Sequence, residues 1–247
     1  MIRKKTADKS EKIARIIYLS VLFSFIIPIV FLILRIIMSD SVPAESADVR
    51  SKADYLLMLL ECVLGVVVIH LPSFLQKRFK FELPTALYLM YILFLYCAIF
   101  LGEVRDFYYL VPHWDTILHT FSSVMAGAFG FIVVATLSRD EHTAISLPPL
   151  FVALFAFCFA STIGTLWEIY EFSFDAILGL NMQKFRLADG TLLIGHAALG
   201  DTMKDIIVDV LGALGASIAG FFSLRNNRGW ASDMITQYCN KPVKAKG

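Results

Sequence analysis

Three aspartates at four-residue spacing stand out in an apolar segment near the C-terminus, residues 201–215. Because an α-helix advances about 100° per residue, Asp201, Asp205 and Asp209 share one stripe of the predicted helix. A charged stripe within an apolar helix cannot face lipid. The segment therefore predicts a site inside a helix bundle, and its glycines Gly212 and Gly215 are expected to allow close helix packing.

Further acids and one histidine lie in or beside other apolar segments. Asp115 and His119 are four residues apart, and Glu168 and Glu171 are three apart, so each pair shares a helical face. Carboxylate oxygens and an imidazole nitrogen are ligands for divalent metals. We therefore expect a divalent metal ion held by Asp115, His119, Glu168 and Asp201.

If the protein is an enzyme that uses this metal, the expected reaction is hydrolysis or group transfer, and the expected substrate is a lipid or a cell-envelope precursor. The metal would polarise the substrate or activate water, with Asp205 as general base. Glu171 and Glu61 are further candidate catalytic residues. The HExxH pattern is absent, and residues 168–171 lack the histidine of the di-iron ExxH pattern. The residues thus indicate a metal site without indicating its reaction, and they leave open whether the protein is an enzyme.

Structural roles compete with this interpretation. Asp115 and Asp201 are also expected as N-caps of their helices, where a side-chain oxygen accepts from free backbone N–H groups. Glu168 and Glu171 fit equally well as solvated residues at a membrane exit. These alternatives involve no ligand.

The deeper acids, Glu61, Asp205 and Asp209, are harder to explain by structure alone, because each costs about 2.5–3.5 kcal/mol to insert into a bilayer. They also suit a transporter or channel in which they form an ion or proton path. That alternative predicts acids in the inner halves of the spans, and the sequence has none there. A third alternative is a non-catalytic scaffold whose acids bind a partner's basic loop.

Composition places these residues in a membrane protein. Of 247 residues, 57% are hydrophobic and 17% charged, the mean hydropathy is +0.69, and apolar runs of about 20 residues recur. The fold class predicted is an all-α, polytopic transmembrane bundle, with an aromatic loop at 103–114 and a polar loop at 180–200. Its six spans are expected at residues 16–34, 55–70, 84–102, 115–138, 148–167 and 201–224, with the fifth helix continuing through 168–171.

Charge distribution predicts the orientation. With the N-terminus inside, the cytoplasmic segments hold fifteen Lys and Arg residues and the outer segments six, Lys184 among the latter. This predicts a cytoplasmic tail at 1–12, a six-span domain at 13–224 and a cytoplasmic tail at 225–247, in the cytoplasmic membrane of a bacterium. The acidic ends of the last three spans then meet at the outer face. The net charge of +1 gives no basic field for nucleic acid, and the expected partners are the lipid bilayer and a lipid-linked or envelope substrate.

Several of these motifs, taken in order, resemble the YjdF-like inner-membrane proteins. They are Glu61 within a span and the segments Leu83-Pro84, Trp114-Asp-Thr-Ile-Leu-His119, Leu166-Trp-Glu-Ile-Tyr-Glu171 and Asp201-Thr-Met-Lys-Asp205 through Gly212. The D-x-x-x-H and D-x-x-x-D elements are more distantly similar to VanZ-like proteins. Asp209 departs from the amide expected at its position. The resemblance covers about residues 54–220 and implies the fold and the site, but no reaction.

Overall fold

Helices account for nearly all of the chain that the structure describes. The computed structural model describes residues 2–38, 52–79, 83–137, 147–187 and 190–233. Within these ranges no strand is present, and the one β feature is an isolated antiparallel bridge between Arg186 and Leu192. The predicted all-α fold is confirmed. Part of the expected C-terminal tail, residues 234–247, lies outside the described residues.

Six helical stretches in the described ranges are long and apolar enough to cross a membrane, which is the number predicted. The first is longer than expected, because helix α1 already begins at Ile2 within the polar N-terminal segment. The sixth helix, α8, begins at His196, five residues before the expected start. The six candidate spans are Lys12–Ile37, Asp54–Phe79, Thr85–Val104, Trp114–Leu137, Pro149–Leu178 and His196–Arg225.

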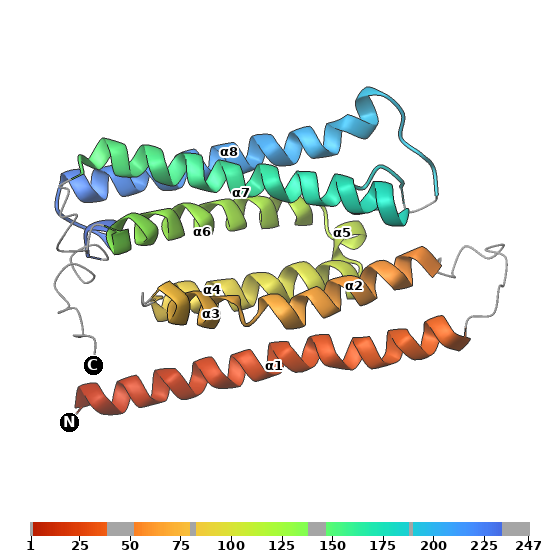
Figure 1. Ribbon diagram of the computed structural model, residues 1–247, viewed down its shortest axis with the longest axis horizontal. Helices are drawn as coiled ribbons and strands as arrows, with labels where there is room; N and C mark the ends of the chain where they lie inside the picture. Colours follow the sequence, from red (N-terminus) through yellow and green to blue (C-terminus); the bar gives the residue numbers. More distant parts are fainter. Residues whose placement is uncertain (1, 39–51, 80–82, 138–146, 188–189, 234–247) are drawn as a thin grey trace. The chain divides into compact units, whose positions relative to one another are not determined.

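The contacts divide the chain into two compact units. The first unit contains residues 1–118 and 170–201, and the second contains residues 119–169 and 202–247. In the first unit, α1 (Ile2–Met38) packs along α2 (Lys52–Val68), which is followed by α3 (Leu71–Phe79) (Figure 1). The chain continues through α4 (Thr85–Leu95), η1 (Tyr96–Val104) and α5 (Phe107–Leu110).

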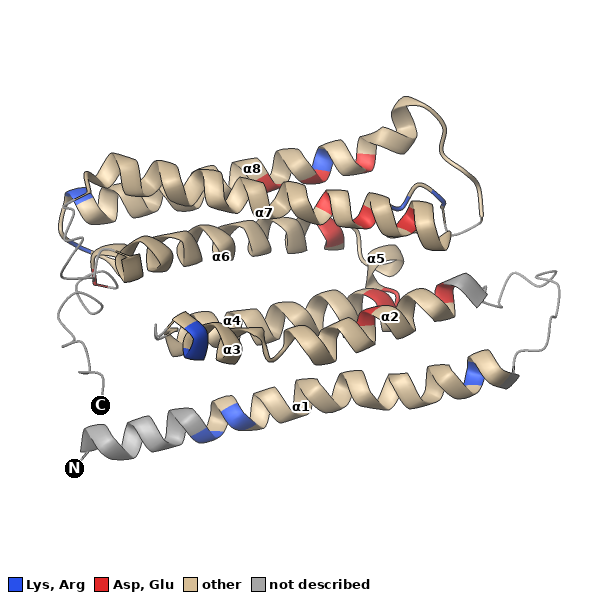
Figure 2. Ribbon diagram, viewed as in Figure 1, with Lys and Arg blue, Asp and Glu red and all other residues tan. Residues whose placement is uncertain are grey.

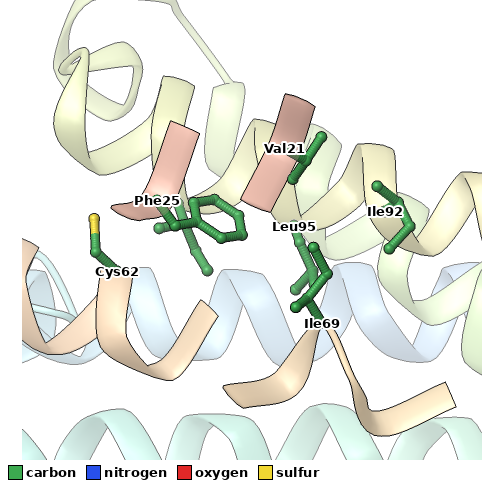
Figure 3. Packing of buried hydrophobic residues seen from close by; sticks show 7 residues of the cluster. Val21, Phe25, Cys62, Ile69, Ile92 and Leu95 are labelled. Carbon is green, nitrogen blue, oxygen red and sulfur yellow. The ribbon is translucent and has the colours of Figure 1, made fainter. Parts of the chain in front are cut away.

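A buried apolar cluster holds α1, α2 and α4 of the first unit together. Phe25, Cys62 and Ile92 are fully buried in it (Figure 3). Gly65 of α2 makes the close approach possible, since a Cβ atom there would lie 2.8 Å from Ile99 and 3.1 Å from the Phe25 ring. Close packing of this kind holds helices together within a bilayer, where lipid is as apolar as the side chains.

The third span changes helix type along its length. It begins as the α-helix α4 and widens into the π-helix η1, which the regular apolar sequence does not predict. Such wide turns are rare, and they are frequent at functional sites. Glu103 lies near the C-terminal end of η1 and is buried, whereas a loop was expected to begin there. Asp106 follows with a left-handed φ of 61°, which turns the chain into the short helix α5.

The second unit is built on the main parts of α6 (Trp114–Leu137), α7 (Pro149–Leu178) and α8 (His196–Arg225). Small residues bring these helices close together: a Cβ at Gly127 would lie 2.9 Å from Ala216, and one at Gly130 would lie 2.9 Å from Ala156. Gly212 is also a close-packing position, as predicted. Gly215 is not, because a Cβ there would meet nothing within 4 Å.

Acidic residues gather in one half of α7 and in one half of α8 (Figure 2). On α7 they lie toward the C-terminal end, and on α8 they lie toward the N-terminal end. They are Glu168, Glu171 and Asp175 on α7, and Asp201, Asp205 and Asp209 on α8. The remaining halves of both helices carry no acid.

Candidate functional site

His119 is the centre of a buried polar cluster in the second unit. It lies in the second turn of α6 and is 7% exposed. One ring nitrogen, Nδ1, lies 3.2 Å from Oδ2 of Asp209 on α8, and the other, Nε2, lies 3.8 Å from Oε1 of Glu168 on α7. Both carboxylates are buried. The imidazole from α6 thus lies between two carboxylates, one from α7 and one from α8.

Packing around Asp209 fixes the position of its carboxylate. Ser123, one turn after His119 on α6, donates a hydrogen bond from its hydroxyl to the backbone oxygen of Asp209. Gly164 of α7 lies directly against the Asp209 side chain, and any Cβ at this position would collide with it. A glycine and a serine on the two neighbouring helices therefore hold Asp209 where it meets the histidine.

The two ring contacts differ in kind. The 3.2 Å contact with Asp209 has hydrogen-bond length, with Nδ1 donating to the carboxylate in any form of the ring that carries a proton on Nδ1. The 3.8 Å separation of Nε2 from Glu168 Oε1 is too long for a hydrogen bond. It is the length of an ion pair when the imidazole is protonated. It is also compatible with two ligand atoms of one ion, since metal–nitrogen and metal–oxygen bonds of about 2.0–2.2 Å place ligand atoms about 3–4 Å apart. A histidine held by a carboxylate through its other nitrogen is a common arrangement in metal sites.

Asp205, one turn before Asp209 on α8, adds another buried carboxylate. One of its oxygens lies within 4.8 Å of a ring nitrogen of His119. Lys204 lies at the more exposed edge, with its Nζ 3.9 Å from Asp205 Oδ1. On α6, Asp115 lies one turn before His119 in the sequence and belongs to the first unit.

The predicted site residues divide between the two units. His119, Glu168 and Asp205 belong to the second unit, where the contacts above bring them together. The structure assigns the others to the first unit: Asp115, Asp201, Glu171 and Glu61. The sequence missed the direct contact between Asp209 and His119, because it shows four-residue spacings but not which partner a side chain meets across two helices.

Two structural alternatives for these residues are wrong. Asp201 is not an N-cap, because α8 begins at His196 and places it in the second turn. Asp115 lies in the first turn of α6, after Trp114, rather than at the cap position. Glu168 is not a solvated exit residue, since it is only 3% exposed, whereas Glu171 is intermediate in exposure.

A second polar cluster, not predicted from the sequence, lies in the first unit around Lys184. Its Nζ lies 3.5 Å from Oε2 of Glu103, 4.6 Å from the centre of the Tyr108 ring and 5.4 Å from that of Tyr109. Burial lowers the pKa of Lys184, but the surrounding negative charges, Glu103 foremost, raise it to a net value above its usual range. Burial raises the pKa of the Tyr108 hydroxyl, and nearby carboxylates raise it further.

Hydrogen bonds shape the loop that carries Lys184. Asp175, near the end of α7, accepts from the backbone N–H of Met182 at 2.7 Å and of Gln183 at 3.0 Å. Asn181 accepts from the N–H of Arg186 and donates to its carbonyl oxygen, both at 2.8 Å. Lys184 itself has a left-handed φ of 52°. Such backbone strain persists only where the surroundings determine the conformation.

Comparison with known proteins adds family membership but no activity. Residues 19–226 match the family model described as "Predicted membrane protein (DUF2238)". A Thermotoga maritima protein, named "Uncharacterized protein", is 31% identical over 144 residues, which cover 57% of this chain and 65% of that relative. The match thus spans less than two thirds of the relative's length. No solved structure matches the chain.

Proposed function

The chain belongs to the DUF2238 family of predicted membrane proteins, and we propose that it is a divalent-metal-dependent enzyme of the membrane. Its substrate class is a lipid or a lipid-linked envelope precursor, and its membrane is the cytoplasmic membrane of a bacterium. The family and the six candidate spans make it a multi-pass membrane protein. The resemblance to YjdF-like proteins is consistent with this family, whereas the comparisons give no support to the VanZ similarity.

One observation carries the proposal: the two nitrogens of His119 face two different carboxylates at two different distances. The hydrogen-bond contact with Asp209 orients the ring so that Nε2 faces Glu168. We assign the metal ligands as His119 Nε2 and Glu168, with Asp205 of the same unit close enough to the histidine to join them. Asp209 is a positioning residue in this account, not a ligand.

Several buried carboxylates in one unit favour the binding of a cation. Glu168, Asp205 and Asp209 are each at most 3% exposed, and like charges in a poorly polarisable interior raise each other's energy. A divalent ion with nitrogen and oxygen ligands neutralises two of them. This gives the acids of the spans a function that compensates for their insertion cost.

The reaction that these groups support is metal-assisted hydrolysis or group transfer. A divalent metal held there would polarise a phosphoryl or acyl oxygen and make a water molecule a better nucleophile. Asp205 would act as the general base that accepts the proton from this water. The leaving group would take up a proton from solvent as its bond to the phosphoryl or acyl group breaks. Glu61 and Glu171 remain candidate catalytic residues, and Asp201 remains a candidate metal ligand, from the sequence alone.

A proton or cation path through Asp209 is the alternative from another functional class, and a scaffold that binds a basic partner is the third. Along α8 no acid follows Asp209, and Asp209 is engaged by His119 and by Ser123. Both facts favour a local site over a path. Cation flux into liposomes that disappears in Asp205→Asn would support the path instead.

The test of the enzyme proposal uses the full chain reconstituted in liposomes of bacterial lipid extract. Wild type and Glu168→Gln are incubated with Zn²⁺, Mn²⁺ or Mg²⁺, and lipids are compared by mass spectrometry. We expect one lipid class to be consumed by wild type with one of the metals, and not by the variant. Equal lipid profiles for wild type, variant and empty liposomes under all three metals would contradict the enzyme proposal.

A further inference from the structure

The cluster of Lys184, Glu103, Tyr108 and Tyr109 belongs to the first unit and includes no ligand of the metal site proposed above. We propose that Glu103, Tyr108 and Tyr109 form a binding site for a primary ammonium group, and that Lys184 is its tethered occupant. The ligand class is an amine, either soluble or part of a lipid headgroup, that exchanges with the lysine.

The geometry around Nζ of Lys184 is that of an ammonium receptor. A buried carboxylate, Glu103, provides the opposite charge at 3.5 Å, and two tyrosine rings present themselves within about 6 Å, the range of cation–π attraction. A plain surface ion pair has one such component, whereas this site has three. Aromatic faces combined with a carboxylate select an ammonium rather than a strongly hydrated metal ion.

The main chain is shaped to form this site. The π-helical turn of η1 carries Glu103, and Gly102 beside it lets the ring of Tyr108 lie against the backbone, since a Cβ at Gly102 would overlap that ring. Asn181 donates to the hydroxyl of Tyr109 at 3.3 Å. The receptor side chains are therefore positioned by contacts that do not involve the ammonium itself.

Excess negative charge explains why the site attracts a cation. Glu61 and Asp115, together with Glu103, act electrostatically on Lys184 within the same unit. Glu103 thus contacts the ammonium directly, and two more acidic groups of the unit favour its charged form. Since buried charge without compensation is costly, the site is expected to take another cation when the lysine leaves.

Tethering makes Lys184 a strong competitor. A group on a short loop has an effective concentration in the millimolar range, so a free amine must exceed that concentration to displace it. Removing the lysine side chain removes this competition. The site should then accept an external amine that the wild-type protein largely excludes.

Chemical rescue tests the proposal. The full chain carrying Lys184→Ala is compared with wild type in detergent micelles, with ethylammonium chloride as the probe and sodium chloride at equal ionic strength as the control. We expect the melting temperature of the variant to be lowered, and ethylammonium to raise it by about 2–4 °C. Wild type should respond less, and sodium chloride should have no such effect on the variant. Equal shifts with both salts, or equal shifts in both proteins, would overturn the proposal.

A second variant shows whether the effect belongs to this site. In Glu103→Gln/Lys184→Ala the carboxylate is gone as well, so ethylammonium should no longer stabilise the protein. If Lys184→Ala alone does not fold, ethylammonium present throughout purification should restore a monodisperse protein, and failure to do so overturns the proposal.

Two sources of the amine can be separated with lipid nanodiscs. A higher melting temperature of Lys184→Ala in phosphatidylethanolamine than in phosphatidylcholine nanodiscs assigns the ligand to a lipid headgroup. A response to ethylammonium without this lipid difference assigns it to a soluble amine. No response to either amine rejects the site.

Discussion

Nδ1 of His119 lies 3.2 Å from Oδ2 of Asp209, a residue 90 positions later in the chain and on a different helix. The contact fixes the orientation of the imidazole, so that Nε2 faces Glu168 at 3.8 Å. A carboxylate that holds a histidine in this way also makes it a better metal ligand. The relationship gives Asp209 a definite role as the residue that orients the ligand.

Replacing Asp209 by asparagine should therefore weaken metal binding without unfolding the protein. The amide oxygen can still accept from Nδ1, but the negative charge that strengthens the imidazole as a ligand is lost. We expect the affinity for the divalent metal to fall about 10–100-fold, measured by isothermal titration of the purified protein.

Asp233→Asn is the matched control, because Asp233 is an exposed acid of the same unit. It should bind metal as wild type does. Equal affinity of Asp209→Asn and Asp233→Asn would remove Asp209 from the metal site.

Gly164 should tolerate no side chain. In Gly164→Ala the added methyl group collides with the Asp209 carboxylate, so either that side chain moves or α7 and α8 separate. We expect the free energy of unfolding to fall by about 1–3 kcal/mol, measured by denaturant titration in micelles, together with weaker metal binding.

Gly215→Ala is the matched control on α8, because its Cβ would meet nothing within 4 Å. Alanine in a helix interior should leave stability unchanged or raise it by about 1 kcal/mol. Similar destabilisation by both alanines would mean that the contact with Asp209 is not what makes Gly164 necessary.

Asp175 should control the order of the loop that carries Lys184. Its carboxylate accepts two backbone N–H groups, and a hydrogen bond to a charged group contributes about 1.5–3 kcal/mol. Asp175→Ala should therefore speed hydrogen exchange at the amides of Met182 and Gln183, measured by mass spectrometry. Unchanged protection of both amides in the variant would show that the loop is held by other contacts.

The stabilising effect of Lys184 should persist into the alkaline range. Its folded-state pKa is raised above the unfolded value of about 10.4, so its contribution is fully present below that pH and is lost as the pH rises through the folded pKa. The difference in melting temperature between wild type and Lys184→Gln should stay constant from about pH 6 to about pH 9. A difference that already shrinks between about pH 7 and about pH 9 contradicts a raised pKa.

The sequence was sufficient for the spans but not for the clusters. Long apolar runs predict membrane helices because a helix needs about 20 apolar residues to cross a bilayer. The structure has six such helices in its described residues, which is the number predicted. The start of α8 at His196 was missed because residues 196–200, which end in Gly200, were assigned to the polar loop at 180–200. A π-helical turn leaves no mark in an apolar sequence, so the buried position of Glu103 was missed as well.

The sequence predicts which site residues share a helix face, but not which residues of different helices meet. Four-residue spacing shows that Asp205 and Asp209 share a face, but it does not say which of them reaches the histidine of another helix. Lys184 was counted only as an outer positive charge, because nothing local in the sequence reveals that Asp175 and Asn181 fold its loop back onto Glu103. Contacts between distant segments depend on packing, which composition and periodicity do not encode.

The metal content of the purified protein shows most directly whether His119 helps to bind a divalent metal ion. Wild type, His119→Ala and Asp233→Asn are purified without chelators, supplemented with Zn²⁺ or Mn²⁺, desalted and measured by inductively coupled plasma mass spectrometry. We expect stoichiometric metal in wild type and in Asp233→Asn, and its loss in His119→Ala. Wild type without stoichiometric metal, or His119→Ala with as much metal as wild type, would contradict it.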